Sequence, residues 1–164
     1  MAVKKILSLG NPMLYEKSAE ISINELDLVK STVVDLHDTL IDFRKQYNCG
    51  RAIAAPQLGI MKRLIYMYID KPIVFINPSL DQFSPEMFEV WDDCMSFPNL
   101  LVRVNRYKSC RIKFKDTNWQ DQKLTFSNDL SELIQHEYDH LDGILATQRA
   151  VDQFSFALKS HVKV

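Results

Sequence analysis

The sequence has no strong excess of charge of either sign. Its 20 Lys and Arg residues nearly balance 21 Asp and Glu residues, which leaves a formal net charge of −1 over 164 residues. Proteins that bind nucleic acid commonly carry a basic bias, so we predict no nucleic-acid binding. No apolar run approaches the roughly 18 residues that a membrane-spanning helix needs, so we also predict no membrane span.

Neither the N-terminal segment nor the cysteine count suggests a secreted protein. Lys4 and Lys5 are not followed by the apolar core or the small-residue cleavage site of a signal peptide. Three cysteines is an odd number that does not suit a disulfide scaffold. We therefore expect a cytoplasmic protein. The length predicts one domain over residues 1–164, large enough to bury a core.

The most informative stretch is HEYDH, residues 136–140. On a helix, two histidines four residues apart lie on one face and can bind the same divalent cation. A glutamate directly after the first histidine can act as general base toward water. The stretch is short, and a solvated helix that carries these letters by chance is the alternative interpretation.

The residues around this stretch predict an internal helix. Asp129 and Glu132 have the spacing of a capping box, and Gly143 is a typical stop signal. Glu137 falls inside an apolar stripe, where a carboxylate is costly unless a charge or a metal accompanies it. The stripe comprises Leu130, Leu133, Ile134, Tyr138 and Leu141.

Catalytic zinc-type sites use three protein ligands, so a third ligand must lie elsewhere. Downstream of the helix only His161 is available, close to the C-terminus. This disfavours an HExxH endopeptidase of the kind that takes its third ligand downstream. The candidate soft ligands upstream are Cys49, Cys94 and Cys110.

The order of predicted elements gives the fold class. Ser22 and Glu25 have capping-box spacing, and the apolar positions that follow predict a long amphipathic helix that ends near residues 48–50. Apolar segments then predict strands over residues 63–69, 73–76, 100–104, 109–115 and 123–126. We predict an α+β fold, in which mostly antiparallel sheets pack around the C-terminal HExxH helix.

Three segments taken together resemble a known family. GRAIAAPQ (residues 50–57), DDCMS (92–96) and HEYDHLDG (136–143) are similar in order and spacing to the motifs GxGxAAxQ, EGCLS and HExDHLxG of peptide deformylase. The N-terminal segment ILSLGNPML (6–14) is also similar to family openings. The resemblance covers about residues 50–143 and is far more specific than HExxH alone.

The resemblance implies a complete set of roles. Cys94, His136 and His140 would bind the metal, and Glu137 would be the general base. The Gln57 side chain and the Met95 N–H would hydrogen-bond the oxygen of the scissile formyl group.

The implied reaction removes the N-formyl group from the N-terminal methionine of nascent polypeptides and releases formate. It is an amide hydrolysis at a C–N bond other than a peptide bond. The implied cofactor is one divalent metal per chain, natively Fe(II), with Zn(II), Ni(II) or Co(II) as alternatives. The implied partner is an N-formylated peptide, and ribosome association is an option.

The chain also departs from the family pattern. Asp92 and Asp93 replace a glutamate and a glycine, and Ala52 replaces a glycine. An aspartate at position 93 adds a side chain beside the ligand and calls for a negative φ. Arg51 replaces a residue that is usually apolar.

Asp129 and Glu132 stand where many members have apolar residues that line the methionine pocket. We interpret Asp129 as a helix cap and Glu132 as a pocket residue. The substrate-binding candidates are Gly50, Arg51, Ala52, Glu132 and Leu133.

The departures leave three functions open. The first is an active peptide deformylase. The second is a related metallohydrolase that acts on another N-formyl or N-acyl compound. The third is a metal-stabilised binding module without catalytic activity.

Overall fold

Two α-helices and two antiparallel sheets form the core of the chain in a computed structural model that describes residues 3–162. The helices are α1 (Leu26–Tyr47) and α2 (Asp129–Leu141). The strands are β1 (Ala52–Ala54), β2 (Leu64–Tyr68), β3 (Pro72–Asp81), β4 (Met87–Asp93), β5 (Leu100–Tyr107), β6 (Ser109–Lys115), β7 (Asp121–Ser127) and β8 (Phe156–Leu158). Neither α-helix has an apolar stretch that would carry the chain across a bilayer.

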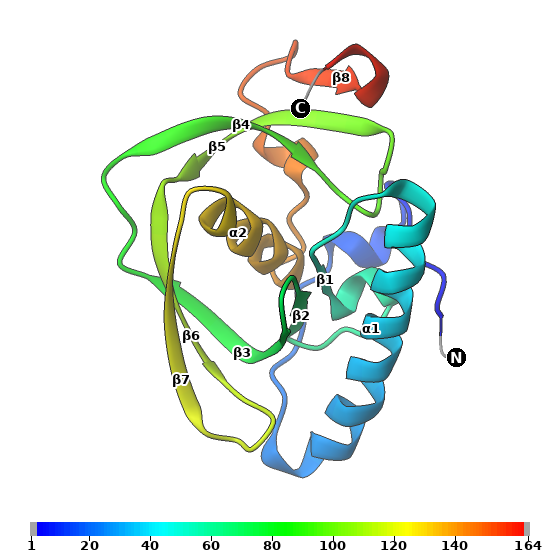
Figure 1. Ribbon diagram of the computed structural model, residues 1–164, viewed down its shortest axis with the longest axis vertical. Coiled ribbons are helices and arrows are strands. Elements are labelled where there is room, and N and C mark those ends of the chain that lie inside the picture. The colour runs from blue at the N-terminus through cyan, green and yellow to red at the C-terminus, as the bar shows by residue number, and fades with distance from the viewer. Residues whose placement is uncertain (1–2, 163–164) are drawn as a thin grey trace.

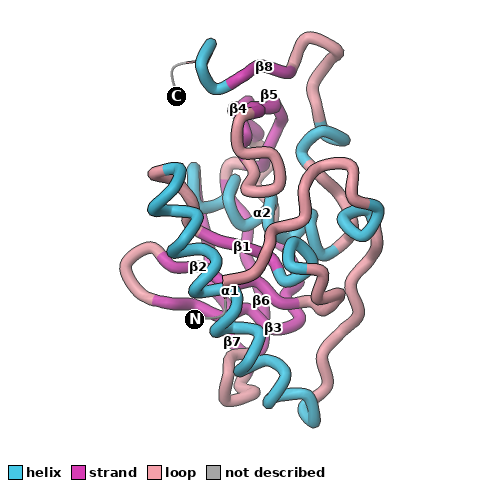
Figure 2. The backbone as a smooth tube through the Cα atoms, turned by 90° about the vertical axis from the view of Figure 1, so that its right-hand side faces the viewer, coloured by secondary structure: helices cyan, strands magenta, loops and turns pink. Residues whose placement is uncertain are grey.

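The two sheets and α2 define the architecture. The larger sheet has the order β1-β2-β3-β6-β7, and the smaller has the order β4-β5-β8. Figure 1 shows α2 enclosed between the sheets, with α1 on the outer side of β1 and β2. Figure 2, a view from the side, shows β8 beyond β5 at one end of the molecule. The predicted α+β fold with antiparallel sheets around the HExxH helix is confirmed.

Helix α1 follows the predicted pattern closely. The Ser22 N–H donates to Glu25 Oε2 at 2.8 Å, just before the helix begins. The helix ends at Asn48, whose left-handed φ of 53° lets its N–H reach the carbonyl of Arg44. The apolar residues that the helix buries recur at helical spacing. They are Val29, Leu36, Leu40 and Phe43.

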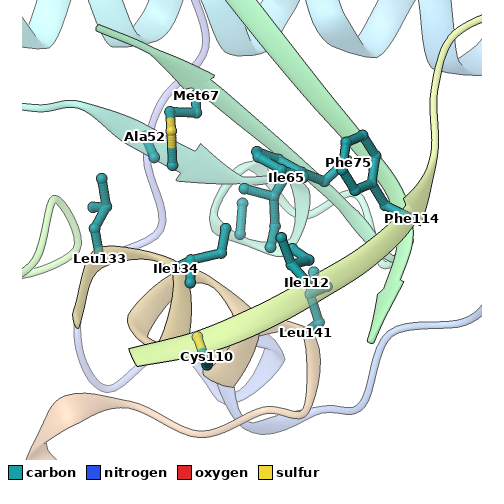
Figure 3. Packing of buried hydrophobic residues seen from close by; sticks show 11 residues of the cluster. Ala52, Ile65, Met67, Phe75, Cys110, Ile112, Phe114, Leu133, Ile134 and Leu141 are labelled. Atoms are coloured by element: carbon teal, nitrogen blue, oxygen red, sulfur yellow. The ribbon is translucent and has the colours of Figure 1, made fainter. Parts of the chain in front are cut away.

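Strand β2 is covered on both faces, which explains its continuous apolar sequence. Leu64 and Tyr66 pack in the cluster that contains α1. Ile65 and Met67 pack in the cluster that contains α2, because successive side chains of a strand point to opposite faces. Figure 3 shows Ile65 and Met67 directed toward Ile134 of α2. The larger sheet therefore separates two apolar cores.

The strands differ from prediction mainly in length. Strand β3 continues to Asp81, past the predicted end at residue 76, across a shift of register between Ile76 and Ser79. Asn77 lies in this irregularity with a φ of 47° and hydrogen-bonds both the N–H and the carbonyl of Ile21. Strands β1, β4 and β8 were not predicted, since β1 and β8 are three residues long and β4 carries three carboxylates.

The sequence predicted that Asp129 caps the HExxH helix, and this prediction is wrong. Asp129 is the first residue of α2, and the N-cap is Asn128, whose side chain makes no capping hydrogen bond. The Asp129 carboxylate instead accepts a hydrogen bond from Arg51, a residue 78 positions away. A long-range ion pair has replaced the local capping contact that the spacing predicts.

Candidate metal centre

The amide side chain of Gln135 helps to anchor helix α2 to β5. Gln135 donates to the Tyr107 carbonyl at 2.8 Å and accepts from the Tyr107 N–H at 3.0 Å. The apolar side of the helix, with Ile134 and Leu141, packs against the larger sheet. This orientation directs the polar side toward the end of β4, where Cys94 follows the strand.

Three donor atoms converge at this junction. The His140 Nε2 lies 3.4 Å from the Cys94 Sγ and 3.2 Å from the His136 Nε2. All three side chains are buried, and their donor atoms lie within 4.8 Å of one another. One thiolate and two imidazoles form a donor set typical of zinc and other divalent transition metals. The cluster therefore fits a single metal ion.

The other two cysteines and the downstream histidine lie outside the cluster. Cys110 is buried in the core, where its Sγ accepts from the Ser131 hydroxyl at 3.5 Å. Cys49 lies near Lys159, with a distance of 3.7 Å between Sγ and Nζ. His161 is exposed. Among the three upstream candidates for the soft ligand, only Cys94 belongs to the group of donor atoms.

Behind His136 lies a buried chain of ion pairs. The His136 Nδ1 is 2.7 Å from Asp92 Oδ1, and Arg106 bonds the other Asp92 oxygen at 2.7 Å. Arg106 also reaches Asp139 at 2.6 Å, and Arg149 holds Asp139 through two hydrogen bonds of 2.6 and 2.7 Å. Such contacts orient a ligating imidazole and fix its tautomer. Asp92 therefore makes the contact to the ligand despite being one methylene shorter than glutamate.

Of the two arginines on β5, only one reaches Asp139. Arg106 pairs with Asp139, whereas Arg103 reaches Asp152 at 3.1 Å and Glu89 at 3.5 Å. Both arginines lie on β5, three residues apart, so their side chains leave opposite faces of the strand.

The electrostatic environment is negative around His136, whereas burial and the charge of His136 lower the pKa of His140. Burial disfavours the charged form of His136, but the charges of Asp92 and Cys94 outweigh it and raise the pKa of His136. Burial likewise opposes the ionised form of Asp92, but His136 and Arg106 lower the pKa of Asp92 to about 2. A negative field that favours a proton on an imidazole also favours a bound cation at the same place.

Glu137 is buried beside the ligands. Burial is the main cause that raises the pKa of Glu137 to about 7. Its Oε2 atom is buried and has no hydrogen-bond partner among residues 3–162. Since buried polar atoms are nearly always satisfied, this oxygen is available to hydrogen-bond a group held in the cavity that Glu137 lines.

A cavity of about 460 Å³ opens beside the cluster. All five predicted substrate-binding residues line it: Gly50, Arg51, Ala52, Glu132 and Leu133. It also contains Cys94, Met95, His136 and Glu137. The remaining lining residues were not predicted from the sequence, and they are Phe43, Arg44, Asn48, Cys49, Tyr68, Ile69, Asp93 and Lys159.

Gln57 is buried next to the thiol rather than in the cavity wall. Its amide nitrogen lies 3.7 Å from the Cys94 Sγ and 3.2 Å from the Ser96 Oγ. Its amide oxygen accepts from the Ala54 N–H at 3.0 Å. The amide is thereby oriented with its donor end toward the cluster. The Met95 side chain, from the same motif as Cys94, contributes to the cavity directly.

Asp93 and Ala52, which replace glycines of the family pattern, both fit the backbone at their positions. Asp93 is not among the residues with positive φ, and its carboxylate accepts from Lys159 at 3.0 Å. Ala52 also avoids positive φ and pairs with Met67 in the sheet. Gly50 retains a φ of 113°, a conformation that favours glycine.

Three charged residues meet at one wall of the cavity. Arg51 Nη1 lies 2.9 Å from Asp129 Oδ2, and Arg51 Nη2 lies 3.6 Å from Glu132 Oε2. The Glu132 side chain is only 14% exposed, whereas that of Asp129 is 73% exposed. Burial, together with the negative charge of Asp92, raises the pKa of Glu132 to about 7. Glu132 is thus the inner member of the group and Asp129 the outer.

Comparisons with known proteins agree with this geometry. The family model described as polypeptide deformylase matches residues 3–155. A peptide deformylase of Leptospira biflexa is 31% identical over 163 residues, with 91% of this chain and 88% of the relative covered. A peptide deformylase from Synechococcus elongatus, solved with actinonin, superposes with a TM-score of 0.86 at 27% identity, covering 94% of this chain and 82% of that chain. A peptide deformylase from Acinetobacter baumannii, solved with Met-Ala-Ser bound, gives a TM-score of 0.82 at 28% identity, covering 91% and 99%.

Proposed function

The chain belongs to the peptide deformylase family, and we propose that it removes the N-formyl group from the N-terminal methionine of nascent polypeptides and releases formate. The bond broken is the C–N bond of a formamide, not a bond between two amino acids. One observation carries the proposal: the buried Cys94, His136 and His140 donors meet next to Glu137 at a cavity. We expect the reaction to take place in the cytoplasm, and ribosome association is part of the proposal.

The three donors would hold one divalent cation, and we propose Fe(II) as the native ion, with Zn(II), Ni(II) or Co(II) as alternatives. Bound there, the cation acts as a Lewis acid that polarises a carbonyl and lowers the pKa of water. Asp92 would keep the His136 ring in position through its contact with Nδ1 at 2.7 Å. The buried site would exclude bulk water from this chemistry.

Proton transfer is assigned to Glu137. Its free carboxylate oxygen would take a proton from water as the water oxygen bonds to the formyl carbon. Glu137 would then give this proton to the leaving amine as the C–N bond breaks. The products are formate and a free amino terminus. The Gln57 amide and the Met95 N–H would hydrogen-bond the oxygen that gains negative charge.

The cavity would receive the first residue of the substrate. Gly50, Arg51, Ala52, Glu132 and Leu133 form part of its wall, so we propose these residues for substrate binding. The related protein from Acinetobacter baumannii was solved with Met-Ala-Ser bound. A peptide of this kind is therefore a suitable test substrate in its formylated form.

The decisive measurement is formate release from formyl-Met-Ala-Ser by metal-replete protein purified without oxygen. Glu137→Gln should keep its metal and lose about two or more orders of magnitude in kcat, in line with general-base contributions. Glu86→Gln is the matched control, because Glu86 is exposed and, among residues 3–162, forms an ion pair only with Lys108. Metal-replete wild-type protein that releases no formate would refute the enzyme and favour the non-catalytic binding module.

A second experiment tests the ligand set independently of turnover. Elemental analysis should find about one metal ion per chain in wild-type protein and a large loss in Cys94→Ala. Cys49→Ala should retain the metal, since Cys49 is outside the donor group. Full metal content in Cys94→Ala would mean that the ligand set is wrong.

A further inference from the structure

The smaller sheet ends in an edge strand that carries apolar side chains. Among residues 3–162, β8 pairs only with β5, so its other edge has no neighbouring strand. Figures 1 and 2 both show β8 at one extremity of the molecule, outside β5. The strand reads Phe-Ala-Leu, without a charge or a proline. Charges and prolines commonly protect an exposed edge from pairing, so this edge is open to a further strand.

The apolar face of the smaller sheet continues onto this edge. Phe156 lies opposite Val102 of β5 in the ladder. Leu158 lies opposite Leu100, and both β5 residues belong to the apolar cluster of the smaller sheet. Directly opposite residues share a face, yet on β8 this face is uncovered. The exposed fractions are 43% for Phe156, 53% for Leu158 and 77% for Phe154, which lies just before the strand.

The hydrogen bonds at the two ends of β8 show which backbone groups point outward. The Arg103 N–H donates to the Ser155 carbonyl at 2.8 Å, and the Lys159 N–H donates to the Asn99 carbonyl at 3.0 Å. Alternate residues of an antiparallel strand direct their backbone groups to the same side, so Phe156 directs its N–H and C=O away from β5. A two-fold axis sets a residue opposite itself, and two copies of Phe156 could then exchange two hydrogen bonds.

The charges that flank β8 suit an antiparallel second copy. Asp152 precedes the strand and Lys159 follows it, and both side chains are partly exposed. Antiparallel pairing about Phe156 would place Asp152 of one copy opposite Ser160 of the other, next to Lys159. A parallel arrangement would bring like charges together instead. The net charge of −1 adds little repulsion between copies.

The other sheet edges are protected in ways that β8 is not. Strand β4, at the opposite edge of the smaller sheet, carries the carboxylates of Glu89 and Asp93. Strand β7, at one edge of the larger sheet, carries Asp121 and Lys123. Strand β1, at its other edge, is buried along its whole length. Among the edge strands of residues 3–162, β8 therefore combines exposure with an apolar, uncharged sequence.

We propose that β8 is an interface for a second copy of this chain. The two strands would pair antiparallel about a two-fold axis at Phe156 and join the two smaller sheets into one continuous sheet. Phe156 would contact its counterpart, and Leu158 would lie opposite Phe154 of the second copy. Lys159 follows β8 and lines the cavity, so the interface adjoins a wall of the candidate site. The dimer does not depend on the proposed deformylase reaction.

Sedimentation velocity over a range of concentrations tests the dimer. Wild-type protein should pass from monomer to dimer as its concentration rises. Phe156→Lys and Phe156→Glu would each set two like charges opposite each other, so each should raise the Kd of the dimer by about tenfold or more. An equimolar mixture of the two variants should restore a dimer with one chain of each kind, because opposite charges then meet. This recovery would also show that both variants fold.

Two further sets of variants serve as controls. Val34 is exposed on α1, so Val34→Lys and Val34→Glu should leave the Kd within about twofold of wild type. At position 158 the φ of −74° suits proline, and the N–H points away from β5. Leu158→Pro removes this donor together with the side chain, whereas Leu158→Ala removes only the side chain. The proline variant should therefore dimerise more weakly than the alanine variant.

The outcomes decide the proposal without any measurement of turnover. Wild-type protein that stays monomeric at its highest soluble concentration would overturn it. A dimer that persists in both Phe156 variants would place the contact on another surface and overturn it as well. If both variants are monomeric and their mixture stays monomeric, Phe156 does not face itself and the pairing is wrong. Loss in each variant with recovery in the mixture would support the interface.

Discussion

Gly143 has no room for a side chain. Its φ is 70°, and a Cβ atom built on it would lie 2.5 Å from the carbonyl oxygen of Tyr15. Both the conformation and the close approach require glycine, and a backbone atom cannot move aside as a flexible side chain would. The glycine follows the end of α2, so it helps to set where the helix that carries His136 and His140 stops.

Gly143→Ala should destabilise the protein by more than the roughly 1–3 kcal/mol that a strained backbone conformation costs, since a clash adds to the strain. The free energy of unfolding in urea measures the effect. Gly10→Ala is the matched control, because Gly10 has a φ of 98° but nothing within 4 Å of its Cβ position. Equal losses in the two variants would show that the contact with Tyr15 contributes nothing.

At the scale of elements, Arg106 of β5 joins β4 to α2. It bonds Asp92 on β4 and Asp139 on α2, and its side chain is 3% exposed. Breaking a buried pair by removing one partner leaves an uncompensated charge, and here two carboxylates would lose a partner. The Arg106 guanidinium thus joins the smaller sheet to the HExxH helix, in addition to the hydrogen bonds between Gln135 and Tyr107.

Arg106→Leu should lower the free energy of unfolding by about 3–5 kcal/mol and weaken metal binding, because Asp92 would hold His136 less firmly. Arg111→Leu is the control: Arg111 pairs with Asp81 at 2.7 and 2.9 Å near the surface. Exposed pairs contribute little, so its effect should be much smaller. Titration with Co(II), followed by absorption, would report the metal affinity; similar losses of stability in both variants would contradict the role of burial.

At the scale of the whole molecule, the donor cluster of Cys94, His136 and His140 connects the two sheets through α2. Cys94 follows β4 of the smaller sheet, while His136 and His140 lie on the helix that packs against the larger sheet. Figure 1 shows α2 between the sheets, where a bound ion would join them. A ligand that binds only the folded state stabilises it in proportion to the logarithm of its concentration.

Removal of metal by a chelator should lower Tm, and above saturation each tenfold increase in free metal should raise the free energy of unfolding by about 1.4 kcal/mol. The unfolding transition in buffered Zn(II) or Co(II) measures this. In Cys94→Ala the dependence on metal concentration should largely disappear. The same slope in wild type and Cys94→Ala would mean that the ion binds elsewhere.

The sequence by itself determined the features that depend on local spacing. The boundaries of α1 follow from apolar periodicity and from the Ser22–Glu25 contact. The two histidines of α2 share a face because a helix repeats every 3.6 residues. The resemblance of three motifs, at residues 50–57, 92–96 and 136–143, predicted the family, and the order of the predicted elements gave the α+β class. The catalytic and substrate-binding roles remain predictions for the experiments above.

Only the tertiary structure decided which distant groups meet. Asp129 pairs with Arg51, Asp92 with His136, and Lys159 with Asp93. None of these contacts is encoded by local spacing, because the partner of a charged side chain is whichever opposite charge the packed sheets and helices bring near. Capping propensity favoured Asp129 as a helix cap, and a long-range ion pair with Arg51 prevailed. These contacts show which partners the residues that depart from the family pattern have in the folded chain.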